Sequence, residues 1–173
     1  MCKFFQLSRQ NLYPVKILHY LDRAQNTLMK YKKYLVDDFS QAKNVIDLIG
    51  ETQPYFWIVT DYEGNYMGFV FLDNFIGSAE KSYSAELTTC FDKCAWGVFP
   101  KYSAKIFLKK CFDELGLEKI KVQIYPDNLR TKTLIKSTGF RYESLLKNDT
   151  LRFGVPQDIE VYALYKSYYY SEK

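Results

Sequence analysis

Apolar and polar positions follow a strand, helix, strand, helix order between residues 85 and 140. Residues 85–91 are mostly apolar or β-branched, which is typical of a strand. From Pro100 onward, apolar residues recur at steps of three and four, which predicts an amphipathic helix that ends near Gly116. Residues 119–124 alternate strictly, so they predict a second strand. Two strands joined by a helix pair in parallel through a right-handed crossover.

Further elements are predicted on both sides of this segment. Upstream, the patterns favour a strand at 4–7, hairpin strands at 56–60 and 66–72, and a loop at 73–81. They also favour a helix opened by residues 13–14, whose apolar side consists of Val15, Ile17, Leu18, Leu21 and Leu28. A further helix, preceded by residues 38–40 and ended by Gly50, has Val45, Ile46, Leu48 and Ile49 on its apolar side. Downstream they favour a helix at 129–137 and strands at 141–144 and 159–165 around a loop at 154–156. The apolar stripe of the helix after Pro100 consists of Ala104, Phe107, Leu108, Cys111 and Leu115.

Composition favours one globular domain that spans residues 1–173. Hydrophobic residues make up 47% of the chain and charged residues 25%, which argues against long disordered stretches. A chain of this length buries most of its apolar surface without disulfides or metals. Strands that alternate with helices predict a mixed α/β fold.

Charge excludes few function classes by itself. The formal net charge is +4, but lysine and arginine are spread along the sequence, so nucleic-acid binding is an unlikely role. No apolar run approaches the roughly 20 residues that a membrane span needs, and the N-terminal residues lack a signal-peptide pattern. We therefore expect a cytoplasmic protein without a membrane partner. A homodimer is compatible with the sequence.

Cysteine and histidine usage argues against metal and nucleophile chemistry. Cys90 and Cys94 have a spacing that could hold a metal, but a zinc site needs four ligands and the single histidine, His19, lies far away in the sequence. We expect no metal site and four free thiols. A lone histidine also disfavours a Ser-His or Cys-His system.

One local motif carries a family resemblance. Asp127 and Asn128 precede the predicted helix at 129–137, and Gly139-Phe140 follows it. Over roughly residues 56–166 this arrangement resembles the GNAT superfamily of acyl-CoA-dependent N-acetyltransferases, and its pattern is most similar to that of the ribosomal-protein N-terminal acetyltransferases. The resemblance implies a twisted mixed sheet of about six to seven strands, with helices on both faces and splayed parallel strands in the centre.

The same resemblance implies acetyl-CoA as cosubstrate. Where the two central strands part, main-chain groups of Thr89, Cys90 and Phe91 would bind the amides of pantetheine. Gly97, Val98, Phe99 and Lys101 would receive the pyrophosphate at a helix N-terminus, with Asn128 and Thr131 as further cofactor contacts. Lys101 also has the ordinary alternative role of an exposed helix lysine.

The phosphate loop departs from the family pattern Q/R-x-x-G-x-G/A. In the best register Cys94, Gly97 and Phe99 occupy its defined positions, and only the glycine matches. Phe99 places a ring where the pattern keeps a small side chain, and Pro100 supplies no N–H donor. A second register, with Lys101, Ala104 and Ile106, starts the helix too late for its apolar stripe.

Glu86 and Asn128 are the catalytic candidates that the resemblance implies. Glu86 resembles the glutamate base on this strand in GNAT histone acetyltransferases; the alternative is a solvent-facing residue at a strand start. Asn128 would hold the cofactor or a water, or it would simply cap the helix that follows. Many members use a tyrosine as the acid at the position of Ile135.

Three hypotheses follow from the sequence. The first is an acetyl-CoA-dependent N-acetyltransferase that transfers an acetyl group to an unknown amine by direct attack. The second, favoured by Phe99, Pro100 and Ile135, is a catalytically inactive GNAT-fold binding or scaffold module of phage or mobile-element origin. The third is a basic nucleic-acid-binding domain, favoured only by the pI near 8.7.

Overall fold

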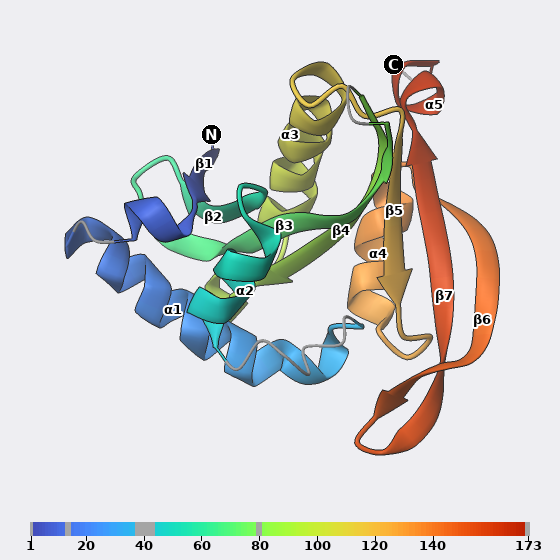
Figure 1. Cartoon of the computed structure of the whole chain (residues 1–173), viewed down its shortest axis with the longest axis horizontal. Coiled ribbons are helices and arrows are strands. Elements are labelled where there is room, and N and C mark those ends of the chain that lie inside the picture. Colours follow the sequence, from blue (N-terminus) through green and yellow to red (C-terminus); the bar gives the residue numbers. More distant parts are fainter. Residues whose placement is uncertain (1, 13–14, 37–43, 79–80, 172–173) are drawn as a thin grey trace. The chain divides into compact units, whose positions relative to one another are not determined.

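A computed structural model describes residues 2–12, 15–36, 44–78 and 81–171 (Figure 1). The strands in this part of the chain are β1 (Cys2–Leu7), β2 (Phe56–Asp61), β3 (Tyr66–Gly77), β4 (Ser82–Phe91), β5 (Lys119–Ile124), β6 (Arg141–Arg152) and β7 (Val155–Tyr165). The α-helices are α1 (Val15–Tyr31), α2 (Val45–Thr52), α3 (Phe99–Asp113), α4 (Leu129–Ser137) and α5 (Lys166–Ser171). Short 3-10 turns lie at Arg9–Asn11, Lys32–Tyr34 and Lys93–Ala95.

The strands form one mixed sheet in the order β1-β2-β3-β4-β5-β7-β6. The pairs β1–β2, β2–β3, β5–β7 and β6–β7 are antiparallel. β4 and β5 pair in parallel, because α3 connects them as a crossover. The mixed α/β fold and the strand–helix–strand prediction are therefore confirmed.

The chain divides into two compact units. Unit 1 comprises residues 1–32, 37–73 and 88–97, and unit 2 comprises residues 33–36, 74–87 and 98–173. β3 and β4 each contribute residues to both units. The single domain over residues 1–173 stays a prediction from composition.

In unit 1, buried strand residues supply most of the core. Phe56, Ile58, Phe69 and Phe71 are fully buried on β2 and β3, and Phe56 stacks on both of the other rings. α1 and α2 contact each other. The buried side of α1 is made of Leu21, Ala24, Thr27 and Leu28. Val15 and Leu18, which we expected on the apolar side, are exposed, because the buried stripe of α1 lies in its second half.

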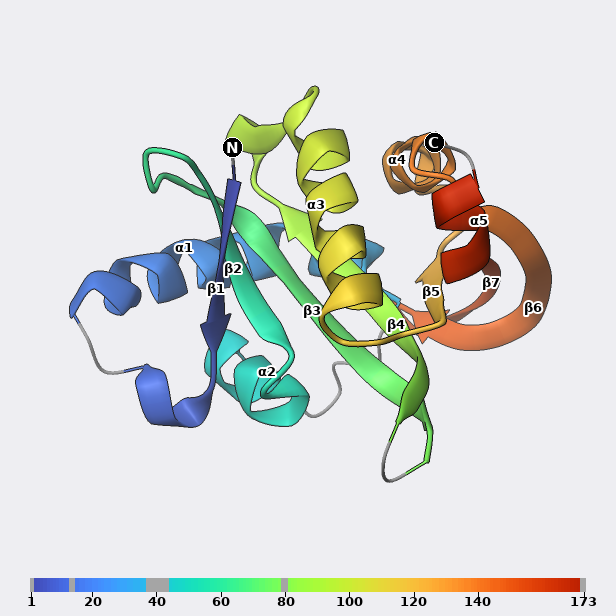
Figure 2. The ribbon, with the colours of Figure 1, turned by 90° about the horizontal axis from the view of Figure 1, so that it is seen from above.

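In unit 2, α3 buries the centre of the predicted apolar stripe, whereas Ala104 is half-buried and Leu115 lies beyond the end of the helix. Phe107, Leu108 and Cys111 have at most 2% of their surface exposed, and Ile120, Val122 and Ile124 form the buried face of β5. α3 and α4 contact each other, and Figure 2 shows both on the same side of β5. β6 and β7 form a long, twisted hairpin in Figure 1.

Several predicted boundaries are wrong. β3 continues through Asp73–Gly77, where we expected a loop, because ladder pairing rather than composition extends a strand. α2 runs past Gly50 to Thr52, so this glycine does not end the helix. β6 extends to Arg152 and β7 begins at Val155, which leaves a two-residue turn at Phe153–Gly154. The predicted helix openings at 13–14 and 38–40 lie outside the described residues.

Candidate functional site

β4 and β5 pair over only part of their length. In unit 2 the parallel register joins Ser84 to Lys119, Ala85 to Ile120 and Glu86 to Lys121. β5 continues to Ile124, and its last three residues pair with β7. In the described part of unit 2 the pairing with β4 ends at Lys121, so the main-chain groups on the β4 side of these last three residues are available to a ligand that mimics a strand.

Glu86 is buried at the end of this short parallel ladder. Only 3% of its surface is exposed, so the solvent-facing alternative is wrong. Its Oε2 accepts hydrogen bonds from Asn74 Nδ2 at 3.3 Å and from Gln123 Nε2 at 3.1 Å. A carboxylate this deep in a sheet would be costly without such donors. The arrangement suits a group that takes a proton from a ligand.

Asn74 and Gln123 are not among the site residues predicted from the sequence. Asn74 lies in the segment that we expected to be a loop, whereas the structure places it in β3. Gln123 belongs to the polar side of the strictly alternating β5, two residues beyond the register partner of Glu86. That alternation was the available signal, since it puts Gln123 on the face of β5 that Glu86 shares.

In unit 1, the predicted pantetheine contacts lie at the end of β4. Thr89 and Phe91 are half-buried and Cys90 is buried. Burial raises the pKa of the Cys90 thiol to about 12, which keeps it protonated and inert as a nucleophile at neutral pH. Cys2, Cys90, Cys94 and Cys111 are free thiols, as the sequence predicts.

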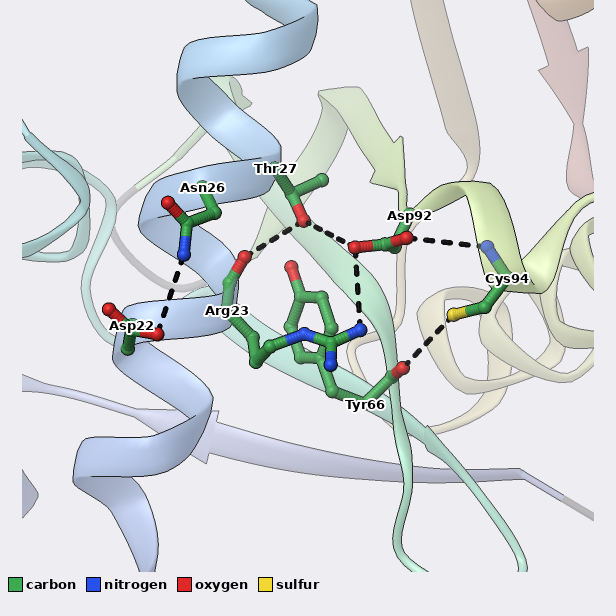
Figure 3. Close-up of polar contacts among 7 residues, drawn as sticks. All are labelled: Asp22, Arg23, Asn26, Thr27, Tyr66, Asp92 and Cys94. Atoms are coloured by element: carbon green, nitrogen blue, oxygen red, sulfur yellow. Dashed lines mark hydrogen bonds and ion pairs between the residues drawn. The ribbon is translucent and has the colours of Figure 1, made fainter.

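Directly after β4, Asp92 organises a polar cluster in unit 1 (Figure 3). Asp92 pairs with Arg23 at 3.6 Å and accepts a hydrogen bond from the Thr27 hydroxyl at 3.4 Å, both from α1. Its other oxygen accepts from the Cys94 N–H and caps the 3-10 turn at Lys93–Ala95. Burial opposes ionisation of Asp92, but the Cys94 amide and the Arg23 guanidinium outweigh it and hold the pKa of the carboxyl below its usual range.

Tyr66 completes this cluster below Arg23. The Arg23 guanidinium lies 5.7 Å from the centre of the Tyr66 ring, and the Cys94 thiol donates to the Tyr66 carbonyl oxygen at 3.6 Å. Burial is the main cause that raises the pKa of Tyr66 above its ordinary value. The cluster thus fixes the conformation of the chain between β4 and Gly97. No sequence motif marks Arg23, Asp92 or Tyr66.

The predicted phosphate-binding residues surround the start of α3. Gly97, in unit 1, adopts φ of +115°, a conformation that side chains rarely tolerate, and a Cβ there would meet no atom within 4 Å. In unit 2, Val98 is the N-cap of α3 and is 86% exposed. Phe99 is the first helical residue, and Pro100 follows it. Lys101 is exposed.

The residues expected around α4 have structural partners. Asn128 caps α4, because its side-chain oxygen accepts from the Thr131 N–H at 3.3 Å. The capping alternative is therefore observed, and a ligand contact by Asn128 or Thr131 stays a prediction. Ile135, at the position of the family tyrosine, is buried with 6% of its surface exposed. It packs in the core and offers no acid.

Residues 2–12, 15–36, 44–78 and 81–171 contain no group of three or more metal-ligating side chains. No helix in the same ranges is both long and apolar enough to cross a bilayer.

Comparison with known proteins places these features in a family. A family model described as "Acetyltransferase (GNAT) domain" matches residues 15–141. No curated protein sequence matches the chain. Among solved structures, a spermidine N-acetyltransferase from Vibrio cholerae in complex with CoA and spermine has a TM-score of 0.72 at 21% identity, over 98% of each chain.

Two further structures show the same fold. An acetyltransferase (GNAT family) from Bacillus anthracis has a TM-score of 0.68 at 17% identity, over 96% of this chain and 95% of the other. RimJ from Mycobacterium smegmatis, in complex with CoA-disulfide, has a TM-score of 0.67 at 14% identity, over 87% of this chain and 79% of the other. The predicted fold class is confirmed.

Proposed function

The chain belongs to the GNAT acetyltransferase family, and on that premise we propose that it is an acetyl-CoA-dependent N-acetyltransferase that acts on an amine. The observation that carries this proposal is the buried carboxylate of Glu86 at the end of the β4–β5 parallel ladder. A binding module has no evident need for an acid group that is 3% exposed and held by two amides.

The reaction needs a base that deprotonates the acceptor ammonium, and it forms no covalent enzyme intermediate. Glu86 takes a proton from the acceptor ammonium, directly or through a water, so that the amine nitrogen can attack the thioester carbonyl carbon. The C–N bond forms, the C–S bond breaks and the thiolate of CoA leaves with the electron pair. After the C–N bond has formed, the nitrogen loses its second proton to solvent and the thiolate takes one up from solvent, because Ile135 supplies none.

Main-chain groups hold the cosubstrate in this proposal. In unit 1, Thr89, Cys90 and Phe91 bind the pantetheine amides. The first turn of α3 in unit 2 faces the pyrophosphate with its N–H groups and positive dipole end, with Lys101 as a nearby cation. The open space beside Gly97 suits an approaching phosphate, whereas Pro100 removes one donor from the turn.

A polyamine is the first acceptor to test. The Vibrio cholerae neighbour is a spermidine N-acetyltransferase whose structure contains spermine. An N-terminal peptide is the second acceptor class to test, because the motif at residues 127–140 resembles that of the ribosomal-protein N-terminal acetyltransferases. A cytoplasmic location and a homodimer remain predictions from the sequence.

Calorimetry and an acetylation assay test the proposal together. Titration with acetyl-CoA is expected to release heat and to raise the melting temperature, because a ligand that binds only the native state stabilises it. Release of free CoA thiol in the presence of spermidine or an N-terminal peptide then reports transfer. Absence of both binding and transfer would refute an acetyltransferase.

The inactive binding module remains a second candidate because of Pro100 and Ile135. Pro100 weakens the N–H array of α3, and Ile135 is a core residue where many relatives have a tyrosine. On this alternative, Phe99→Gly would gain CoA binding that the parent chain lacks. Binding of CoA by the parent chain would exclude it.

A further inference from the structure

Two carboxamides from different strands converge on one oxygen of Glu86. Asn74 reaches it from β3 and Gln123 from β5, the two sheet neighbours of β4. All three residues lie in unit 2. Both amides donate, and a donor to a carboxylate favours the ionised form over the protonated form. Burial of Glu86 acts in the opposite sense, because a low-polarity environment disfavours the charge.

Asn74 has an unusual backbone for a strand residue. Its φ is +44°, in the left-handed region that residues other than glycine enter rarely and that asparagine tolerates best. Such a conformation costs free energy and persists where the surrounding structure requires it. Here it turns the Asn74 amide toward Glu86 Oε2, 12 residues further along the chain.

Two lysines of β5 share the face of the sheet on which Glu86 lies. Lys121 is its register partner, and Lys119 lies on the same face of the strand. Lys119 is paired with Glu143 at 2.7 Å, so its charge is already engaged. Carboxamides do not titrate, so the two donors themselves stay unchanged across the working pH range.

We propose that Asn74 and Gln123 are positioning residues that keep Glu86 ionised and in one orientation for proton abstraction from the acceptor amine. The proposal rests on the function proposed above. A base must be deprotonated and within reach of its substrate proton before the reaction begins. Two donors from separate strands fix both properties at once, because a rotation that moves Oε2 away weakens both hydrogen bonds together.

Direct titration of Glu86 tests this proposal without any acceptor. The protein is labelled with ¹³C at glutamate Cδ, and the Glu86 signal is assigned by its loss in Glu86→Gln. Gln123→Met keeps the length of the side chain and removes its N–H donor. Asn74→Gly removes the second donor at a residue whose φ of +44° glycine adopts readily. Each variant is expected to raise the pKa of Glu86 by about 1–2 units, the equivalent of one lost charge-assisted hydrogen bond.

Matched substitutions control for general effects. Gln157→Met makes the same change on β7, where the amide donates to the carbonyl oxygen of Pro156 at 2.9 Å. Asn148→Gly makes the same change at another left-handed asparagine, with φ of +52°. Both controls are expected to leave the pKa of Glu86 unchanged. An unchanged pKa in both Gln123→Met and Asn74→Gly would overturn the proposal.

A pH profile separates positioning from a merely structural role. With acetyl-CoA and spermidine as substrates, the acid limb of the pH profile of kcat/KM is expected to move to higher pH in Gln123→Met and Asn74→Gly. The size of this move is expected to equal the change in the pKa of Glu86 that the titration gives. A rate lowered equally at every pH, with a fixed limb, would show that the amides only support the fold. If the parent chain acetylates no amine, the proposed function fails, and the titration still decides whether the two amides hold Glu86 ionised.

Discussion

Two carboxylates six residues apart in the chain have opposite environments. Glu86 lies within β4 in unit 2, is 3% exposed, and accepts hydrogen bonds from side chains of both neighbouring strands. Asp92 directly follows β4 in unit 1, keeps 24% of its side chain exposed, and binds a guanidinium and a local backbone amide.

The difference separates a chemical role from a structural one. Asp92 has a cation beside it and caps a turn, so its charge is neutralised and its geometry serves the local backbone. Glu86 is held by long-range amide contacts that do not serve any helix or turn. A buried acid with that kind of support is a better candidate for proton transfer than an exposed cap.

The largest expected effect is on catalysis by Glu86. Glu86→Gln should lower kcat for acetylation by about 100-fold or more, because a positioned base contributes roughly that much. Asp92→Asn should lower it by less than about tenfold, since the amide retains a capping oxygen. Steady-state assays with acetyl-CoA and spermidine measure both variants. Equal losses of kcat in Glu86→Gln and Asp92→Asn would contradict the assignment of a chemical role to Glu86 and a structural role to Asp92.

A second prediction concerns the close packing beside Cys90 in unit 1. A Cβ on Gly68 would lie 2.4 Å from the Cys90 carbonyl oxygen and 2.9 Å from the Phe91 Cα, which are backbone atoms that cannot move aside cheaply. Gly68→Ala should therefore lower the free energy of unfolding by about 1–3 kcal/mol. Urea denaturation measures the change.

The matched control for Gly68 is a glycine with space around it. Gly116 has φ of +68° and no atom within 4 Å of an added Cβ, so Gly116→Ala should cost only backbone strain, about 1 kcal/mol. A Gly68→Ala protein as stable as the parent would show that β3 and β4 do not approach as closely as described.

The smallest expected effect is on the pH-dependent contribution that the Arg23–Asp92 ion pair makes to the free energy of unfolding. The pKa of Asp92 is lower in the folded protein than in the unfolded chain, so the contribution is complete above about pH 4 and is lost as pH falls through the folded value. Arg23→Met should cost up to about 1 kcal/mol of unfolding free energy at pH 7, since the pair is partly exposed, and almost nothing near pH 2.

A double-mutant cycle assigns that loss to the pair. Arg23→Met and Asp92→Asn are combined, and the coupling free energy is taken from urea unfolding at both pH values. A coupling that persists unchanged in acid would contradict an ionic origin.

The central part of the fold was predictable because its patterns are local. The alternation at Lys119–Ile124 and the stripe on α3 led to correct elements, and the strand–helix–strand order led to the parallel pairing. Strand length was not predictable from propensity, since β3 and β6 extend through polar residues that ladder pairing holds.

The candidate site was predictable only where a family motif reached it. Glu86 and Asn128 could be selected from the family resemblance. Whether Glu86 is a base or a solvent-facing residue depends on its burial, and whether Asn128 contacts a ligand or caps a helix depends on its hydrogen-bond partners. Asn74, Gln123, Arg23 and Asp92 carried no motif.

The sequence by itself determined which segments become strands and helices around Glu86, and the family to which the chain belongs, because periodicity and motif spacing are properties of neighbouring residues. Tertiary structure alone decided that a glutamate on β4 is buried and that amides from β3 and β5 meet on one of its oxygens. Those contacts join residues 12 and 37 positions away from Glu86, and no local pattern encodes a distance across a sheet.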